Sequence, residues 1–210
     1  NIRDHRHVTS LLHRIETTDI GVLVTPTLSF DERGHQVNHM TYYCVGWSGN
    51  GEKPVDFYPT AEDFVGEGGN FERPYAIVKN AEGVKAGTRI EGLEAVGGLH
   101  FSEVTLEPEE ECSYLIFTGI TEDIQEIRNL SKTYTTREMV LEELEKTKAY
   151  WQEKVNVAYH TGDSDFNQFM HWVSFQPILR RIYGCSFLPH HDYGKGGRGW
   201  RDLWQDCLAL

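Results

Sequence analysis

The spacing of apolar residues changes once along this chain, near residue 120. Before that point the apolar residues come in short runs bounded by Gly, Pro, Asn or Asp, a pattern typical of β-strands. Residues 100–106 alternate between apolar and polar side chains, as a half-buried strand does. Strands are therefore predicted at 20–24, 40–45, 75–78, 99–106 and 114–117, with an acidic turn at 107–111. Several short strands at this spacing favour an antiparallel β-sandwich.

Beyond residue 120 the apolar residues follow a helical period. Thr135 and Glu138 fit a capping box, and Val140, Leu144 and Trp151 share one helical stripe, which predicts a helix near 136–155. A second helix is predicted from Ser164, and Pro177 is expected to kink it or tighten its entry. A Gly-rich loop over 185–199 and a third helix from Trp200 follow. The predicted fold class is α+β and multidomain, with divisions at 1–120, 121–158 and 159–210.

Charge and composition exclude several classes of function. The formal net charge is −12, so no basic excess exists to displace counterions from nucleic acid or to bind an anionic membrane. No apolar run is long enough to span a bilayer. The four cysteines are far apart and are expected to be reduced, buried thiols of a cytoplasmic protein. Because the chain does not begin with Met and stops within an apolar run, it is expected to be part of a longer protein.

Residues 46–74 are predicted to form a long loop within the β-rich part. The stretch 57–70 contains acidic residues, Asp63 among them, interspersed with aromatic residues and glycines. Long loops of this kind are commonly functional. The hypothesis is that this loop reaches the mouth of an active site, across the interface of a homodimer; the alternative is a surface excursion with no function.

The densest cluster of polar and aromatic residues lies at 198–206. On a helix Asp202 would share a face with Asp206 and, if the helix begins early enough, with Arg198. An arginine fork and a carboxylate suit sugar hydroxyls or phosphate, and Trp200 supplies a stacking face. Two carboxylates on one helix point the same way, whereas inverting sugar chemistry needs groups on opposite sides of the ring. Asp202 is therefore interpreted as a binding residue; a structural ion pair in a Trp core is the alternative.

Two other patterns near this cluster are weaker. The glycines of 194–199 fit GxGxxG, but a predicted helix precedes them, where a dinucleotide site needs a strand. His190, His191 and Asp192 lack further ligands at the spacing of a zinc site. Neither a nucleotide nor a metal is predicted.

Residues 193–206, YGKGGRGWRDLWQD, resemble the Gly-rich loop and Arg-Asp-x-x-Gln-Asp segment of glycoside hydrolase family 94, the inverting disaccharide phosphorylases. Asp63-Phe64-Val65-Gly66, within 58–66, resembles an Asp-x-Phe-x-Gly loop in that family's N-terminal domain. The resemblance implies a β-sandwich, a helical linker and the first helices of an (α/α)₆ barrel. The family's members include cellobiose, cellodextrin, laminaribiose and chitobiose phosphorylases.

The resemblance also implies roles for individual residues. Asp202 would hold the glucosyl unit in subsite −1, with Arg201 beside it and Arg198 and Trp200 as further substrate-binding residues; Asp63 would belong to an active-site loop. The spacing of a further family arginine is not reproduced, and Arg198 or Lys195 would stand in for it. The general acid and the phosphate ligands are expected outside this chain, so no catalytic residue is assigned within it.

The reaction so implied is phosphorolysis with inversion. Phosphate attacks the anomeric carbon while a carboxylic acid protonates the glycosidic oxygen, giving α-glucose 1-phosphate. Inorganic phosphate is then a co-substrate, and neither a metal nor an organic cofactor is required. A β-linked glucose disaccharide or oligosaccharide is the expected substrate, with laminaribiose favoured and cellobiose or cellodextrin next. The alternatives are an inverting (α/α)₆ hydrolase and a non-catalytic sugar-binding module that uses aromatic residues such as Trp47, Trp200 and Trp204.

Overall fold

The computed structural model describes residues 9–31 and 34–183. Two compact units are present, and the boundary between them falls after Val140. The first unit holds a five-stranded sheet and one two-stranded sheet, and the second holds most of helix α5 (Arg137–Lys154) together with helix α6 (Ser164–Tyr183). Antiparallel β-structure followed by helices is the α+β arrangement that the sequence predicts.

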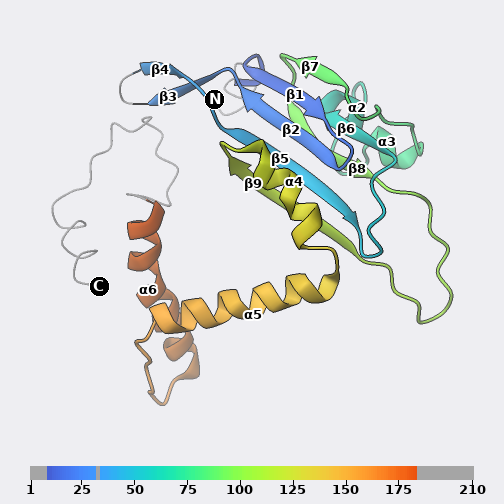
Figure 1. Cartoon of the computed structure of the whole chain (residues 1–210). Helices are drawn as coiled ribbons and strands as arrows, with labels where there is room; N and C mark the ends of the chain where they lie inside the picture. Colours follow the sequence, from blue (N-terminus) through green and yellow to red (C-terminus); the bar gives the residue numbers. More distant parts are fainter. Residues whose placement is uncertain (1–8, 32–33, 184–210) are drawn as a thin grey trace. The chain divides into compact units, whose positions relative to one another are not determined.

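A five-stranded antiparallel sheet forms the centre of the first unit, with the strand order β7-β1-β2-β5-β9 (Figure 1). Its longest ladder joins β5 to β9, from Thr41 opposite Thr121 to Ser48 opposite Tyr114. A separate two-stranded ladder joins β3 (Leu28–Asp31) to β4 (Gly34–Val37). The bounds of the central strands are β1 His13–Thr17, β2 Gly21–Pro26, β5 Thr41–Ser48, β7 Arg89–Glu91 and β9 Tyr114–Thr121.

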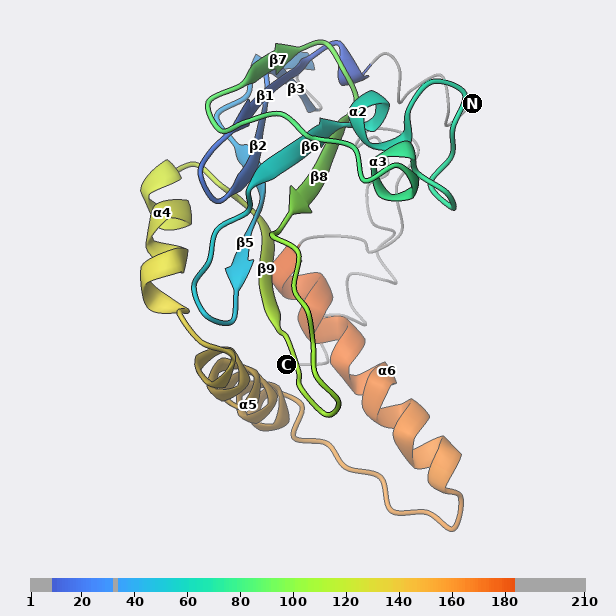
Figure 2. The same ribbon diagram turned by 90° about the vertical axis from the view of Figure 1, so that its right-hand side faces the viewer.

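A second ladder covers part of one face of this sheet. Strand β6 (Asp56–Thr60) pairs with β8 (Ala95–His100), and the two lie against β1 and β2 (Figure 2). Between the layers Ile15, Val22 and Phe57 are almost completely buried. Successive side chains of a strand alternate between its two faces, and Ile15 on β1 and Val22 on β2 lie on the face that β6 covers. The two layers form the antiparallel sandwich that the sequence predicts.

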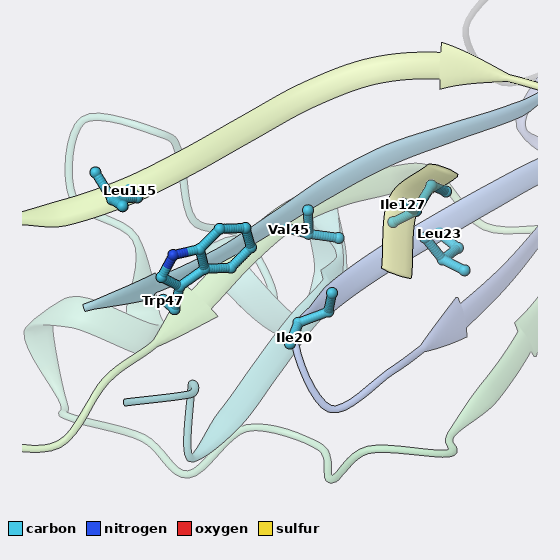
Figure 3. Close-up of a cluster of buried hydrophobic side chains, with 6 residues drawn as sticks. All are labelled: Ile20, Leu23, Val45, Trp47, Leu115 and Ile127. Atoms are coloured by element: carbon cyan, nitrogen blue, oxygen red, sulfur yellow. The ribbon is translucent and has the colours of Figure 1, made fainter. Parts of the chain in front are cut away.

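Helix α4 (Ile124–Thr133) covers the opposite face of the large sheet. Asp123 caps it by accepting a hydrogen bond from the Gln125 N–H, and Ile127 points into the sheet. The buried cluster under α4 consists of Ile20, Leu23, Val45, Trp47, Leu115 and Ile127 (Figure 3). The sequence predicts a helical linker over 121–158 but does not delimit this helix within it, although Ile124, Ile127 and Leu130 have helical spacing behind an Asp cap.

The second unit confirms the two predicted helices. Asp163 accepts hydrogen bonds from the N–H groups of Asp165 and Phe166, so α6 begins at Ser164 as predicted. Trp151 on α5 contacts Phe175 on α6 edge-to-face, with ring centroids 4.8 Å apart. Thr135 does not cap α5 as predicted, because its hydroxyl donates to Met139 Sδ. Hydrogen bonds from its own N–H and from Thr136 lower the pKa of Glu138.

Two predicted strands are wrong. Residues 75–78 form the short helix α3 (Tyr75–Val78), whose first turn follows Pro74, a residue with φ already suited to helix entry. Residues 101–106 lie outside any strand because β8 ends at His100, opposite the first residue of β6, so no partner strand remains. The alternating pattern of 101–106 is genuine, but Val104 and Leu106 stay exposed.

The predicted long loop at 46–74 is also wrong. Its first residues complete β5, and the stretch 56–65 forms β6 followed by helix α2 (Ala61–Val65). Every residue of β6 is buried. The acidic and aromatic residues that suggest a loop in the sequence are instead distributed between a buried strand and a short helix.

The remaining expectations concern residues outside the described ranges. These include the Gly-rich loop at 185–199, the helix from Trp200, the histidines at 190–191 and two of the four cysteines. Helices α5 and α6 form no barrel within the described residues, so the (α/α)₆ barrel and the domain boundaries stay predictions. No helix within 9–31 and 34–183 has the length and apolar character needed to span a membrane.

The described thiols provide a testable difference in reactivity. Cys44 and Cys112 are both free, Cys44 half-buried and Cys112 exposed, so the prediction of burial is wrong for Cys112. Burial raises the pKa of the Cys44 thiol. At pH 7.5 a smaller fraction of Cys44 is therefore thiolate than in an ordinary exposed cysteine. Its alkylation by iodoacetamide should be about tenfold slower than that of Cys112. Peptide mass spectrometry measures both rates. Raising the pH should increase the alkylation rate of Cys44. Equal rates at the two cysteines in the folded protein would contradict the burial of Cys44.

Candidate functional site

Asp63 is the one predicted site residue within the described ranges, and it lies at the corner between β6 and α2. Arg198, Trp200, Arg201 and Asp202 lie outside the described residues. The local geometry around Asp63 therefore shows what this part of the candidate site contains.

Asp63 and Thr60 hold the start of α2 by reciprocal hydrogen bonds. The Thr60 hydroxyl accepts from the Asp63 N–H at 3.1 Å and donates to Asp63 Oδ2 at 2.7 Å. Thr60 is 1% exposed, whereas Asp63 is exposed. A hydroxyl cap with an acidic residue three positions on has the spacing of a capping box, but here the carboxylate accepts from the cap's hydroxyl instead of its backbone N–H. Asp63 thus has a structural role, and its exposed carboxylate keeps acceptor capacity for a ligand.

The Phe and Gly of the same motif have structural roles as well. Phe64 contacts Tyr58 on one side and Phe71 on the other, with ring centroids 6.0 and 6.2 Å apart. Gly66 ends α2 with φ +79°, and a Cβ there would lie 2.6 Å from Tyr75 Cβ. Glycine is therefore required both for its backbone conformation and for the close approach of α3. The segment Asp63-Phe64-Val65-Gly66 therefore shapes and anchors the β6–α2 corner.

A buried carboxylate lies at the other end of β6. The Asp56 side chain is 4% exposed; its Oδ1 lies 2.7 Å from His100 Nδ1 on β8 and its Oδ2 lies 3.8 Å from Lys85 Nζ. Close by, the Tyr58 hydroxyl donates to the Ala81 carbonyl oxygen. Burial and the charge of Asp56 raise the pKa of Tyr58, so this hydroxyl stays protonated at neutral pH.

This second cluster is a structural junction rather than a catalytic group. Both Asp56 oxygens have a partner, and together they tie β6 to β8 and to the segment that carries Lys85. Sequence reasoning does not find the cluster, because Asp56 and His100 are 44 residues apart and only the β6–β8 register brings them opposite each other. No three His, Cys, Asp or Glu side chains within the described ranges are arranged to hold a metal ion.

Removal of the Asp56 charge should destabilise the sandwich. Asp56→Asn keeps the shape but weakens the contacts to His100 and Lys85, and we expect a loss of about 1–3 kcal/mol in unfolding free energy. Asp19→Asn is the matched control, because the Asp19–Lys53 ion pair is exposed on both sides and should contribute less than about 1 kcal/mol. Urea unfolding of both variants measures the difference; equal, small losses would show that the junction contributes little.

One aromatic residue suggested for sugar binding is excluded by its position. Trp47 is 3% exposed, stacks on Phe117 at 5.0 Å and donates from Nε1 to the Tyr134 carbonyl oxygen. Its ring faces are occupied within the protein, so the proposal of Trp47 as a sugar-stacking residue is wrong. Its role is in the core beneath α4.

Comparison with protein families identifies the sandwich. Residues 4–137 match the model described as glycosyl hydrolase 94, supersandwich domain. The match contains both β-layers and α4, and it extends over more than half of the 210 residues. No curated protein matches the chain.

Proposed function

This chain belongs to glycoside hydrolase family 94, and we propose that it forms part of an inverting β-glucoside phosphorylase. The observation that carries the proposal is the match of residues 4–137 to the family's supersandwich domain. The family is one of disaccharide phosphorylases, for which a sugar and phosphate are the substrates. The resemblance of 193–206 to the family's Arg-Asp-x-x-Gln-Asp segment adds support from a separate part of the sequence.

The proposed reaction uses inorganic phosphate where a hydrolase uses water. Phosphate attacks the anomeric carbon of a β-glucoside from the face opposite the leaving group, and the C–O bond to the leaving sugar breaks as that oxygen is protonated. The products are α-glucose 1-phosphate and a shortened sugar. Within this proposal laminaribiose is the favoured substrate, and cellobiose or a cellodextrin comes next.

The residues of this chain act in binding. The Asp202 carboxylate accepts hydrogen bonds from hydroxyls of the glucosyl unit, Trp200 offers a stacking face, and Arg198 and Arg201 bring positive charge to a chain whose net charge is −12. We assign the general acid and the phosphate ligands to residues outside this chain. Helix α6 would be the first helix of an (α/α)₆ barrel. The protein would form a homodimer, in which the exposed Asp63 carboxylate would face the active-site entrance.

Phosphate dependence tests the proposal against its two alternatives. The protein that carries this chain is incubated with laminaribiose or cellobiose, each with and without phosphate, and glucose 1-phosphate and free glucose are assayed. Release of glucose 1-phosphate only with phosphate supports the proposal, and the faster sugar identifies the linkage. Equal glucose release with and without phosphate would establish a hydrolase, and sugar binding without any turnover would establish a binding module.

A further inference from the structure

A cavity of about 230 Å³ lies at the end of the β5–β9 ladder, on the first unit. One wall is the turn that follows β5, and the other is the segment that leads into β9. The two walls are held together, because the Gly49 N–H donates to the Ser113 carbonyl oxygen at 2.7 Å. A Cβ at Gly49 would lie 2.2 Å from Ser113 Oγ, so the two walls approach closely and a larger residue would require the Ser113 side chain to rotate. The cavity is therefore a defined feature of the fold.

Two aromatic rings line the cavity. Phe101 and Tyr114 contact each other with ring centroids 4.5 Å apart and planes at 46°. Tyr114 is 42% exposed, so a large part of its ring is available to a ligand. Tyr114 is opposite Ser48 at the last pair of the ladder, next to the turn that forms the first wall. An aromatic pair at the wall of a polar cavity is a binding feature rather than a core feature.

Hydrogen-bonding groups surround these rings. The carboxylates of Glu52, Glu110 and Glu111 and the side chains of Asn50 and Ser102 line the same cavity. The hydrogen bond with Cys112, together with burial and the nearby Glu52 carboxylate, raises the pKa of Tyr114. Glu52 and Tyr114 line the same cavity, so a ligand that packs on the ring would have carboxylate acceptors available within the cavity.

The chemistry of the lining selects the class of ligand. Three carboxylates disfavour an anion such as phosphate, and no group of metal-ligating side chains in the described ranges is arranged to hold a metal ion. A neutral sugar ring fits both features, because its C–H face packs on an aromatic ring and its hydroxyls donate to carboxylates. We propose that this cavity is a sugar-binding site on the sandwich, which takes one glucosyl ring of a β-linked oligosaccharide. The choice of a β-linked glucose oligosaccharide rests on the proposed function, whereas the presence of a sugar site is tested without turnover.

Protection of Cys112 from alkylation tests the site. Cys112 is exposed and lines the cavity, whereas Cys44 lies outside it and serves as the internal control. The protein that carries this chain is treated with iodoacetamide at increasing concentrations of laminaritriose or cellotriose, and the two cysteine peptides are followed by mass spectrometry. We expect saturable slowing of Cys112 alkylation by at least about fivefold, with no change at Cys44.

Substitutions connect the protection to the proposed contacts. Tyr114→Ala should raise the trisaccharide concentration needed for half-protection about tenfold, whereas Tyr114→Phe keeps the ring and should change it far less. Glu52→Gln should also weaken protection. Tyr42→Ala is the matched control, because Tyr42 is another exposed tyrosine of the β5–β9 ladder outside the cavity, and it should leave protection unchanged. Each variant is compared with its own alkylation rate without sugar.

Three results would overturn the proposal. The first is the absence of Cys112 protection up to the solubility limit of either trisaccharide. The second is protection that Tyr114→Ala leaves unchanged. The third is protection by an oligolysine peptide but not by sugar, which would assign the cavity to cationic ligands. Each result is independent of turnover. A protein that releases glucose 1-phosphate yet shows no Cys112 protection would refute this site and keep the proposed reaction.

Discussion

Trp47→Ala should destabilise the sandwich by about 3–5 kcal/mol, which is among the largest effects expected of a single substitution. Trp47 contributes to the core through its area, through its stacking on Phe117 and through the hydrogen bond from Nε1 to the Tyr134 carbonyl oxygen. Alanine would leave a cavity beneath α4 and an unpaired carbonyl group. Urea unfolding at constant pH measures the loss.

Trp47→Phe separates the two contributions. Phenylalanine keeps an aromatic ring against Phe117 but cannot donate to Tyr134, so its cost should lie well below that of alanine, at about 1–3 kcal/mol. Because Tyr134 follows α4, hydrogen exchange in α4 should accelerate in both variants. Losses below about 1 kcal/mol for Trp47→Ala would show that the cluster under α4 is not a principal source of stability.

Asp202→Asn should lower kcat/KM for phosphorolysis by about 100-fold or more, because it removes a charged acceptor whose hydrogen bonds to the glucosyl unit strengthen in the transition state. Asparagine has nearly the same volume, so the unfolding free energy should hardly change. Initial rates of glucose 1-phosphate formation, together with a urea titration, provide both measurements.

Asp165→Asn is the control for this substitution. Asp165 is an exposed residue in the first turn of α6 and has no assigned role in binding. It should change kcat/KM less than about twofold, as is usual for a surface substitution without an assigned contact. Unchanged turnover in Asp202→Asn would refute the subsite −1 assignment, even if the protein proves to be a phosphorylase.

The sequence predicts the elements whose patterns are long and self-contained. Strands β2, β5 and β9 and helices α5 and α6 occur where apolar runs or helical stripes indicate them. The errors come from short runs that depend on tertiary partners. Residues 75–78 are apolar and strand-like in composition, yet they form one helical turn with Ala76 buried. For four residues the sequence pattern cannot distinguish a strand from a helical turn.

Charged residues hide other elements from sequence analysis. Strand β1 contains His13, Arg14 and Glu16, and only Ile15 and Thr17 are buried. The Asp56–His100 contact is likewise set by strand register, which a single sequence does not specify. The motif around Asp63 is found from sequence, but its structural role as a helix cap becomes evident only from the contacts of Thr60.

The anomeric form of the product tests the central claim most directly. Proton NMR follows a β-glucoside such as laminaribiose with inorganic phosphate and the protein that carries this chain, from the first turnovers onward. The account predicts α-glucose 1-phosphate, formed in proportion to the phosphate consumed and without free glucose from the attacked unit. Formation of β-glucose 1-phosphate, or of free glucose with no phosphate consumed, would contradict it.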